Sequence, residues 1–126
     1  MEAQVIEKSG AVFLDIKDFQ LKLPADKAEK AKPYIGKTVS FGIRPEDIYD
    51  RSMYHGTVDN NVIIANIEIV EQLGAEEFIY FLTQTQSFVA KYDPTVNVHI
   101  GDTNKEAIFD MNRVHIFDGE TEMTVF

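Results

Sequence analysis

Short apolar segments separated by polar turns constrain this chain more than any other feature of its sequence. Several of them alternate apolar and polar residues, as Ala65–Ile69 does. A period of two places the apolar side chains on one face of a half-buried strand. The segment Phe78–Leu82 is apolar throughout, which indicates a strand buried on both faces. About eight such strands, with turns every 8–12 residues or so, predict a mainly all-β fold, either a small barrel or a sandwich.

One short helix is expected between Pro24 and Pro33. Asp26 is a suitable N-cap residue, and Glu29 stands three positions later, as in a capping box. Ala28 is a good helix former, and Pro33 prevents further extension because it lacks an N–H donor.

The stretch Tyr49–Asn61 has the composition of a loop and is a candidate boundary within the chain. Loops of this length are uncommon inside a compact unit unless they separate subregions or serve a function. We therefore expect a single domain over residues 1–126, with a first β subregion and the helix at 1–62 and a barrel portion at 63–126.

The net charge of −9 at pH 7 argues against a nucleic-acid partner. Binding to nucleic acid depends largely on neutralising phosphates, and the 12 Lys and Arg residues are scattered along the chain. The absence of cysteine excludes disulfides, thiol nucleophiles and cysteine metal sites in this sequence. No apolar run approaches the ~20 residues of a membrane helix.

Catalytic motifs are also missing from the sequence. Gly36-Lys37-Thr38 matches only the last three positions of a phosphate-binding P-loop and is read better as a turn that enters a strand. The three histidines do not have metal-ligand spacing, and neighbouring acids such as Glu76 and Glu77 would point to opposite faces of a strand. We therefore expect no catalytic residue, no metal site and no cofactor site.

The segment Gly42–Asp47 is the most constrained polar feature of the sequence. Pro45 fixes its own φ and pushes Arg44 towards extended geometry, so that the guanidinium projects from a strand end. A guanidinium suits bidentate binding of a carboxylate. Two interpretations remain open: an internal Arg44–carboxylate pair that locks the corner, or a contact offered to a neighbouring domain or protein.

Several segments resemble one family in order and spacing. Over residues 10–122 the sequence resembles the C-terminal regulatory domain of the ATPase subunits of maltose-type ABC sugar importers. The segments are Phe19–Pro24, Val39–Ile48, Ile67–Glu76, Phe88–Lys91, Phe109–Met111 and His115–Asp118. Lys91 stands where the family commonly has arginine, so the charge is kept and the bidentate geometry is lost.

The resemblance implies a fold and a setting. The fold would be an OB-fold-like β barrel of the TOBE or molybdate-binding-protein (MOP-like) type, with additional strands and one short helix. An ATPase domain precedes this region in the family, and its Walker motifs, which bind ATP and Mg²⁺, are absent from this sequence. The chain itself would therefore be non-catalytic.

The resemblance also implies partners for the domain. Family members form homodimers on the cytoplasmic side of the cell membrane, where they attach to permeases through the ATPase domains. Some also receive a regulatory protein. Arg44, Pro45, Glu46 and Asp47 would form the hallmark loop at a domain interface, and Gln72, Leu73 and Gly74 a nearby hairpin tip.

Two other functions compete with a regulatory and dimerisation role. A free-standing module that binds an oxyanion or an oligosaccharide could use the same barrel, although a charge of −9 gives no electrostatic help to anion binding. A nucleic-acid-binding barrel should interleave aromatic and basic residues on one sheet face. The aromatics at 78–88 are instead surrounded by acids and apolar residues.

Overall fold

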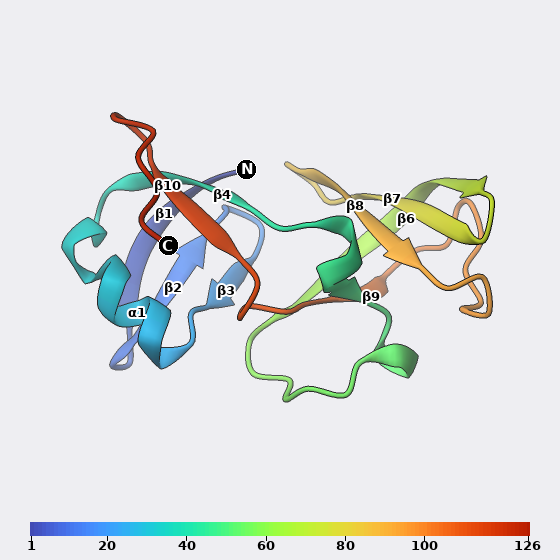
Figure 1. The fold of residues 1–126 in the computed structure, drawn as a ribbon, viewed down its shortest axis with the longest axis horizontal. Coiled ribbons are helices and arrows are strands. Elements are labelled where there is room, and N and C mark those ends of the chain that lie inside the picture. Colours follow the sequence, from blue (N-terminus) through green and yellow to red (C-terminus); the bar gives the residue numbers. More distant parts are fainter.

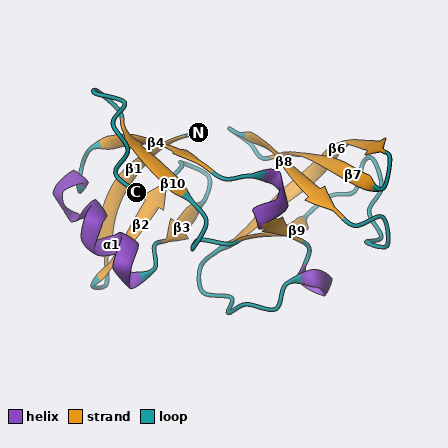
Figure 2. Ribbon diagram, in the orientation of Figure 1, coloured by secondary structure: helices purple, strands orange, loops and turns teal.

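The computed structural model describes all residues from Met1 to Phe126 and contains ten strands, one α-helix and three 3₁₀-helices. The strands form two five-stranded antiparallel sheets that lie side by side along the long axis of the molecule (Figure 1; Figure 2). No helix combines the length and apolar character that crossing a membrane requires. The elements in chain order are β1 (Glu2–Lys8), β2 (Ala11–Asp15), β3 (Gln20–Lys22), α1 (Ala25–Ala31), η1 (Lys32–Tyr34), β4 (Thr38–Gly42), η2 (Pro45–Asp47), β5 (Ile48–Tyr49), η3 (Arg51–Met53), β6 (Val62–Leu73), β7 (Glu76–Leu82), β8 (Ser87–Tyr92), β9 (Lys105–Phe109) and β10 (His115–Asp118).

The first sheet has the strand order β10-β4-β1-β2-β3. β1, β2 and β3 form a meander, and β4 returns after α1 to pair with the outer side of β1. In β4, Val39 and Phe41 are buried while Ser40 between them is exposed, so the alternation in the sequence decides which face meets the core. Five antiparallel strands with open edges at β3 and β10 make a partly open barrel of the OB-fold type. The prediction of a mainly β, OB-fold-like barrel is confirmed.

The second sheet has the strand order β5-β9-β6-β7-β8 and is organised by the long strand β6. The first part of β6 pairs with β9, and its second part pairs with β7. A β-bulge at Glu68 shifts the register between Ile67 and Ile69. Bulges bend a strand, which allows one strand to serve both neighbours in a curled sheet.

The predicted helix is present, but its N-terminus differs from the expectation. α1 begins at Ala25 after Pro24, and no side chain caps it. Asp26 lies in the first turn instead, where its negative charge still suits the helix dipole. The capping box was therefore wrong, because a proline before the helix already sets the backbone for its first turn.

The two sheets do not divide the chain at residues 62 and 63. The chain leaves the first sheet after Gly42, builds the whole second sheet, and returns after Phe109 to add β10 beside β4. Side-chain contacts also join the two halves. The Thr85 N–H donates to Asp18 at 3.3 Å, and the Thr85 hydroxyl donates to the same carboxylate at 2.5 Å.

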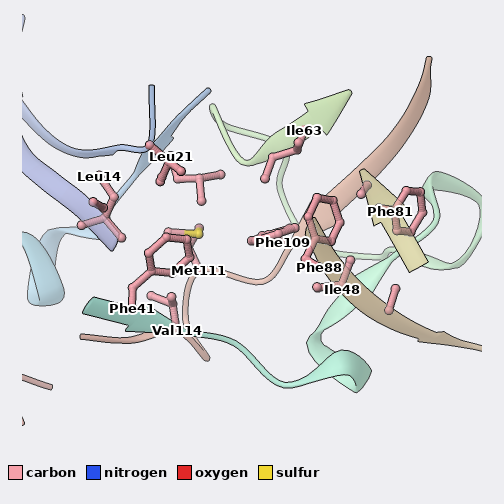
Figure 3. Packing of buried hydrophobic residues seen from close by; sticks show 14 of the residues in the cluster. Leu14, Leu21, Phe41, Ile48, Ile63, Phe81, Phe88, Phe109, Met111 and Val114 are labelled. Carbon is pink, nitrogen blue, oxygen red and sulfur yellow. The ribbon is translucent and has the colours of Figure 1, made fainter. Parts of the chain in front are cut away.

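The hydrophobic core is continuous across both sheets. Its 25 buried residues form one cluster. Figure 3 shows Met111 between Phe41 of the first sheet and Phe109 of the second. The Phe109 ring meets Phe88 edge-on, with ring centroids 5.1 Å apart. Separating the sheets would expose these side chains at a cost of roughly 25 cal/mol for each Å² of apolar surface.

The last residues of the chain cover part of the β10 edge. The Val125 N–H donates to the Ile116 carbonyl at 2.9 Å, and the Ile116 N–H donates to the Phe126 carbonyl at 3.1 Å. The ring of Phe126 lies against Lys27 of α1, with Nζ 4.7 Å from its centroid. Backbone groups that an edge strand would leave unpaired are thus partly satisfied within the chain.

Asn61 is the one buried polar residue of the structure. Its side-chain oxygen accepts from the Asp59 N–H at 2.8 Å, and its amide donates to the Phe109 carbonyl at 2.9 Å. The Phe109 N–H donates to the Asn61 carbonyl at 2.9 Å. Asn61 therefore fixes the end of the long loop to β9.

We predict that Asn61→Ala lowers the free energy of unfolding by about 1–3 kcal/mol, because buried backbone groups lose their partners. Urea denaturation followed by circular dichroism would measure this loss. Asn97→Ala, at an exposed position where the side chain makes no hydrogen bond, is the matched control. Equal stabilities of the two variants would contradict a clamping role for Asn61.

Candidate functional site

The segment after β4 forms the predicted rigid corner. Arg44 is extended, with φ −76° and ψ 148°, and Pro45 begins the 3₁₀-helix η2. The Asp47 N–H donates to the Arg44 carbonyl at 2.9 Å and closes the turn. Ile48 then returns to the core and is fully buried. Proline sets both the turn and the geometry of the residue before it, which is why the sequence alone could locate this corner.

The guanidinium of Arg44 has no carboxylate partner in this structure. Arg44 and Glu46 are both exposed, and Arg44 is absent from every ion pair within 4.0 Å. The internal Arg44–carboxylate pair, one of the two interpretations from the sequence, is therefore not formed. Five N–H donors face solvent at a position that the backbone holds rigidly.

Asp47 carries the least favourable charge of the corner. Burial is the main cause that raises the pKa of this carboxyl above its ordinary value. Glu46 and Asp110 raise the pKa further, while Arg113 and Arg44 lower it without offsetting the other causes.

The corner lies where the chain crosses between the sheets in both directions. The Asp110 N–H, on the return crossing, donates to the Asp47 carbonyl at 3.0 Å. Figure 1 shows η2 beside the segment that leads from β9 to β10. Sequence reasoning missed this contact, because Asp47 and Asp110 lie far apart in the chain and form no recognisable motif.

The first residue of the chain also lies close to the corner. The Met1 amino group donates to the Phe41 carbonyl at 2.8 Å, and the Phe41 N–H donates to the Met1 carbonyl at 2.7 Å. Phe41 precedes Arg44 by three residues in the same extended segment. Residue 1 is therefore held a few residues from the unpaired guanidinium.

The hairpin tip expected near the corner lies elsewhere. Gln72, Leu73 and Gly74 are exposed at the turn from β6 to β7, with φ +64° at Gly74. Figure 1 shows this turn at the outer end of the second sheet, whereas η2 lies near the middle of the molecule. The expectation of a nearby tip was wrong, because the length of β6 carries the turn away from the crossings.

The apolar run of β7 is covered on one face only. Ile79 and Phe81 are buried, whereas Leu82 remains 44% exposed on the opposite face, beside the partly exposed Phe78 and Tyr80. The prediction of burial on both faces was thus half right. An apolar run cannot reveal whether the element that covers its second face belongs to the same chain.

A cleft beside α1 brings together no recognisable catalytic arrangement. It has a volume of about 670 Å³ and lies between α1, the turn of the first hairpin and the 54–61 loop. Its lysines, Lys22 and Lys32, are engaged by Asp59 and Glu29, each at 2.8 Å. No cluster of three or more His, Cys, Asp or Glu side chains suits a metal ion.

Comparison with solved structures shows a likeness of fold. The cytoplasmic molybdate-binding protein ModG superimposes with a TM-score of 0.67 over 91% of this chain and 92% of that chain, at 13% sequence identity.

Comparison of sequences shows closer relatives. Residues 1–48 match the family model for the MalK OB fold domain. The chain is 39% identical over 118 residues to the oligosaccharides import ATP-binding protein MsmX of Bacillus subtilis, covering 94% of this chain and 31% of that protein. It is 37% identical over 117 residues to the trehalose/maltose import ATP-binding protein MalK of Thermococcus litoralis, covering 90% of this chain and 31% of that protein. The chain thus spans about a third of the length of these curated relatives.

The segment matched by the family model includes the corner at Arg44. The sequence similarity to the two relatives extends over nearly the whole chain. Over nearly its whole length the chain is therefore a homologue of sugar-import ATP-binding proteins, and its residues 1–48 match the MalK OB fold domain.

Proposed function

We propose that this chain acts as the regulatory and dimerisation domain of the ATP-binding subunit of a sugar importer. The observation that carries the proposal is the corner at Arg44, a rigid backbone turn that presents an exposed and unpaired guanidinium at a crossing between the two sheets. The names of the relatives support a place within a sugar importer, since both relatives are sugar-import ATP-binding proteins. In this role the chain performs no chemistry, and ATP and Mg²⁺ belong to an ATPase domain outside it.

The corner suits a contact with that ATPase domain. A domain joined ahead of residue 1 would begin beside Arg44, because Met1 pairs with Phe41. Because the backbone at Arg44 is already fixed, binding of its guanidinium to a carboxylate or a carbonyl costs side-chain entropy and little backbone entropy. Movement of the ATPase domain would then reach both sheets through the crossings at Asp47 and Asp110.

The partners follow from this role. Two copies of the subunit form a homodimer, their ATPase domains attach to permeases at the inner face of the cell membrane, and a regulatory protein can bind the exposed domain. A lasting contact between two regulatory domains raises the effective concentration of the ATPase domains. When ATP binds, the two ATPase domains can then close again without first having to meet in solution.

Replacing Arg44 by Ala should leave the stability of the chain almost unchanged, within ~2 °C in melting temperature, because no partner is lost. In the full importer, the same change should weaken the coupling of ATP hydrolysis to transport, and Arg44→Lys should restore it only in part. Arg51→Ala is the control, since the guanidinium of this arginine is already engaged by Glu106 within the chain. Melting several degrees lower in Arg44→Ala would assign the residue a structural role and defeat the proposal.

Asp47→Asn should raise the melting temperature at pH 7 by roughly 1–3 °C. The raised pKa of Asp47 means that the folded state favours the protonated carboxyl, so ionisation opposes folding above that pKa. The gain should shrink as the pH falls through the folded pKa, which lies above 3.8.

The matched control is Asp93→Asn. Hydrogen bonds from the Thr95 backbone and side chain lower the pKa of Asp93, so its ionised form favours folding at pH 7. This variant should melt lower than the parent. If Asp47→Asn also melted lower than the parent, the charge of Asp47 would carry no cost.

Calorimetry should detect no binding of Mg-ATP to the 126-residue chain, whereas the full subunit should bind it. The same titration with molybdate, tungstate and maltodextrins tests the alternative of a small-ligand module on this barrel. Tight binding of ATP would overturn the regulatory role, and saturable binding of an oxyanion or a maltodextrin would favour the alternative.

A further inference from the structure

Two of the three arginines of the chain are exposed and form no ion pair. They are Arg44, at the corner after β4, and Arg113, in the turn that leads back to β10. The third, Arg51, is engaged by Glu106. The two unpaired guanidiniums belong to one region of the fold, because each lies on one of the two crossings between the sheets.

The two crossings are tied together at both of their ends. At one end β4 pairs with the start of β10, and at the other the Asp110 N–H donates to the Asp47 carbonyl at 3.0 Å. On each crossing the arginine stands two residues beyond the strand pair and three residues from the tie between Asp47 and Asp110. Arg44 and Arg113 therefore occupy equivalent positions on neighbouring segments.

The backbone holds both arginines in the same way. The Asp47 N–H donates to the Arg44 carbonyl at 2.9 Å, and the Arg113 N–H donates to the Asp110 carbonyl at 2.9 Å. Each arginine thus stands at one end of a closed turn. Gly42, on the same side of the chain as Arg44 by alternation, has no side chain, and nothing lies within 4 Å of where a Cβ would stand. The surface beside the corner is therefore open.

The acids of the corner do not satisfy these arginines. Burial raises the pKa of Asp47, and the nearby charges of Arg113 and Arg44 lower it without offsetting burial. Both guanidiniums thus lie near Asp47, but neither comes within 4.0 Å of its carboxylate. The Asp110 carboxylate accepts the Asn112 N–H at 3.1 Å instead. Two forks of N–H donors therefore remain free on this surface.

Two neighbouring guanidiniums suit a partner that carries negative charge and accepts several hydrogen bonds. Each fork matches the two oxygens of a carboxylate. A single backbone carbonyl would leave two like charges uncompensated, whereas a segment with two neighbouring Asp or Glu side chains supplies one carboxylate for each fork. The charges of Glu46, Asp47 and Asp110 reduce the net positive charge of the region, so binding depends on direct hydrogen bonds more than on long-range attraction.

We propose that Arg44 and Arg113 together form a binding site for an acidic segment of the ATPase domain that carries two neighbouring carboxylates. The inference rests on the proposed function and names the chemistry of the surface that the corner contacts. A domain joined ahead of Met1 would begin beside this site, because Met1 pairs with Phe41. Arg113, which no motif of the sequence singles out, takes an equal part in the contact.

Nuclear magnetic resonance of the isotope-labelled chain tests the site, since its three arginines give three Nε–H signals. The probe is the peptide acetyl-Asp-Glu-amide, and acetyl-Asn-Gln-amide is the matched control. The acidic peptide should shift the signals of Arg44 and Arg113 along one saturation curve, with a Kd of about 1–10 mM. The Arg51 signal should not move, because Glu106 already holds that guanidinium. The control peptide should shift none of the three signals.

Arg113→Gln should raise the Kd reported by the Arg44 signal about tenfold, whereas Arg51→Gln should leave it unchanged. Both replaced residues are exposed, and the backbone amide signals report whether each variant is folded. A response at only one of Arg44 and Arg113, or at neither, would overturn the shared site. Tighter binding of inorganic phosphate than of the acidic peptide would also overturn the inference, because it would assign the site to a small anion.

In the full importer, Arg113→Ala should weaken the coupling of ATP hydrolysis to transport as Arg44→Ala does. The double variant should lose less than the sum of the two single losses, because both residues bind one segment. If the peptide shifts both signals but neither replacement changes the coupling, the proposed function fails and the acid-binding site stands. If Arg44→Ala alone weakens the coupling and no signal responds, the proposed function stands and the inference fails.

Discussion

Between β9 and β10 the chain crosses back to the sheet in which it began, and this return determines how the two halves of the molecule lie. The second sheet is tied to the first at both of its ends, by the segment after Gly42 and by the segment before His115. The hydrogen bond from Asp110 to Asp47 joins the two crossings, and Met111 and Phe109 fill the core between the sheets. The halves therefore cannot separate without breaking buried contacts. The position of Arg44, on one of the crossings, follows from the same constraint.

The corner at Arg44 and the exposed apolar side chains on the outer face of β7 lie on different parts of this frame. The corner at Arg44 is near the middle of the molecule, and the outer face of β7 belongs to the second sheet alone. A contact at one surface leaves the other free. A continuous core between the surfaces allows a displacement at one to be felt at the other.

Local features of the sequence were sufficient for those parts of the structure that local forces determine. Alternation located the buried face of β4, and Pro45 located the corner, because both act on the backbone within a few residues. The long-range arrangement could not be inferred in this way. The return of β10 to the first sheet, the clamp at Asn61 and the contact between Asp47 and Asp110 join residues far apart in the chain. The same applies to the outer face of β7, since an apolar run indicates burial without identifying what buries it.

The pairing of β10 with β4 has a consequence for how the protein folds. Its register joins His115 to Gly42, so the first sheet gains its last strand only after nearly the whole chain is available. Contacts between residues so distant in sequence are slow to form, because the entropy of closing a long loop is lost before the contacts stabilise the chain. During synthesis, the outer edge of β4 stays unpaired while the second sheet emerges, because β10 is made after that sheet. β10, which is made after the whole second sheet, thus decides when the edge of β4 is closed against misassembly with another strand.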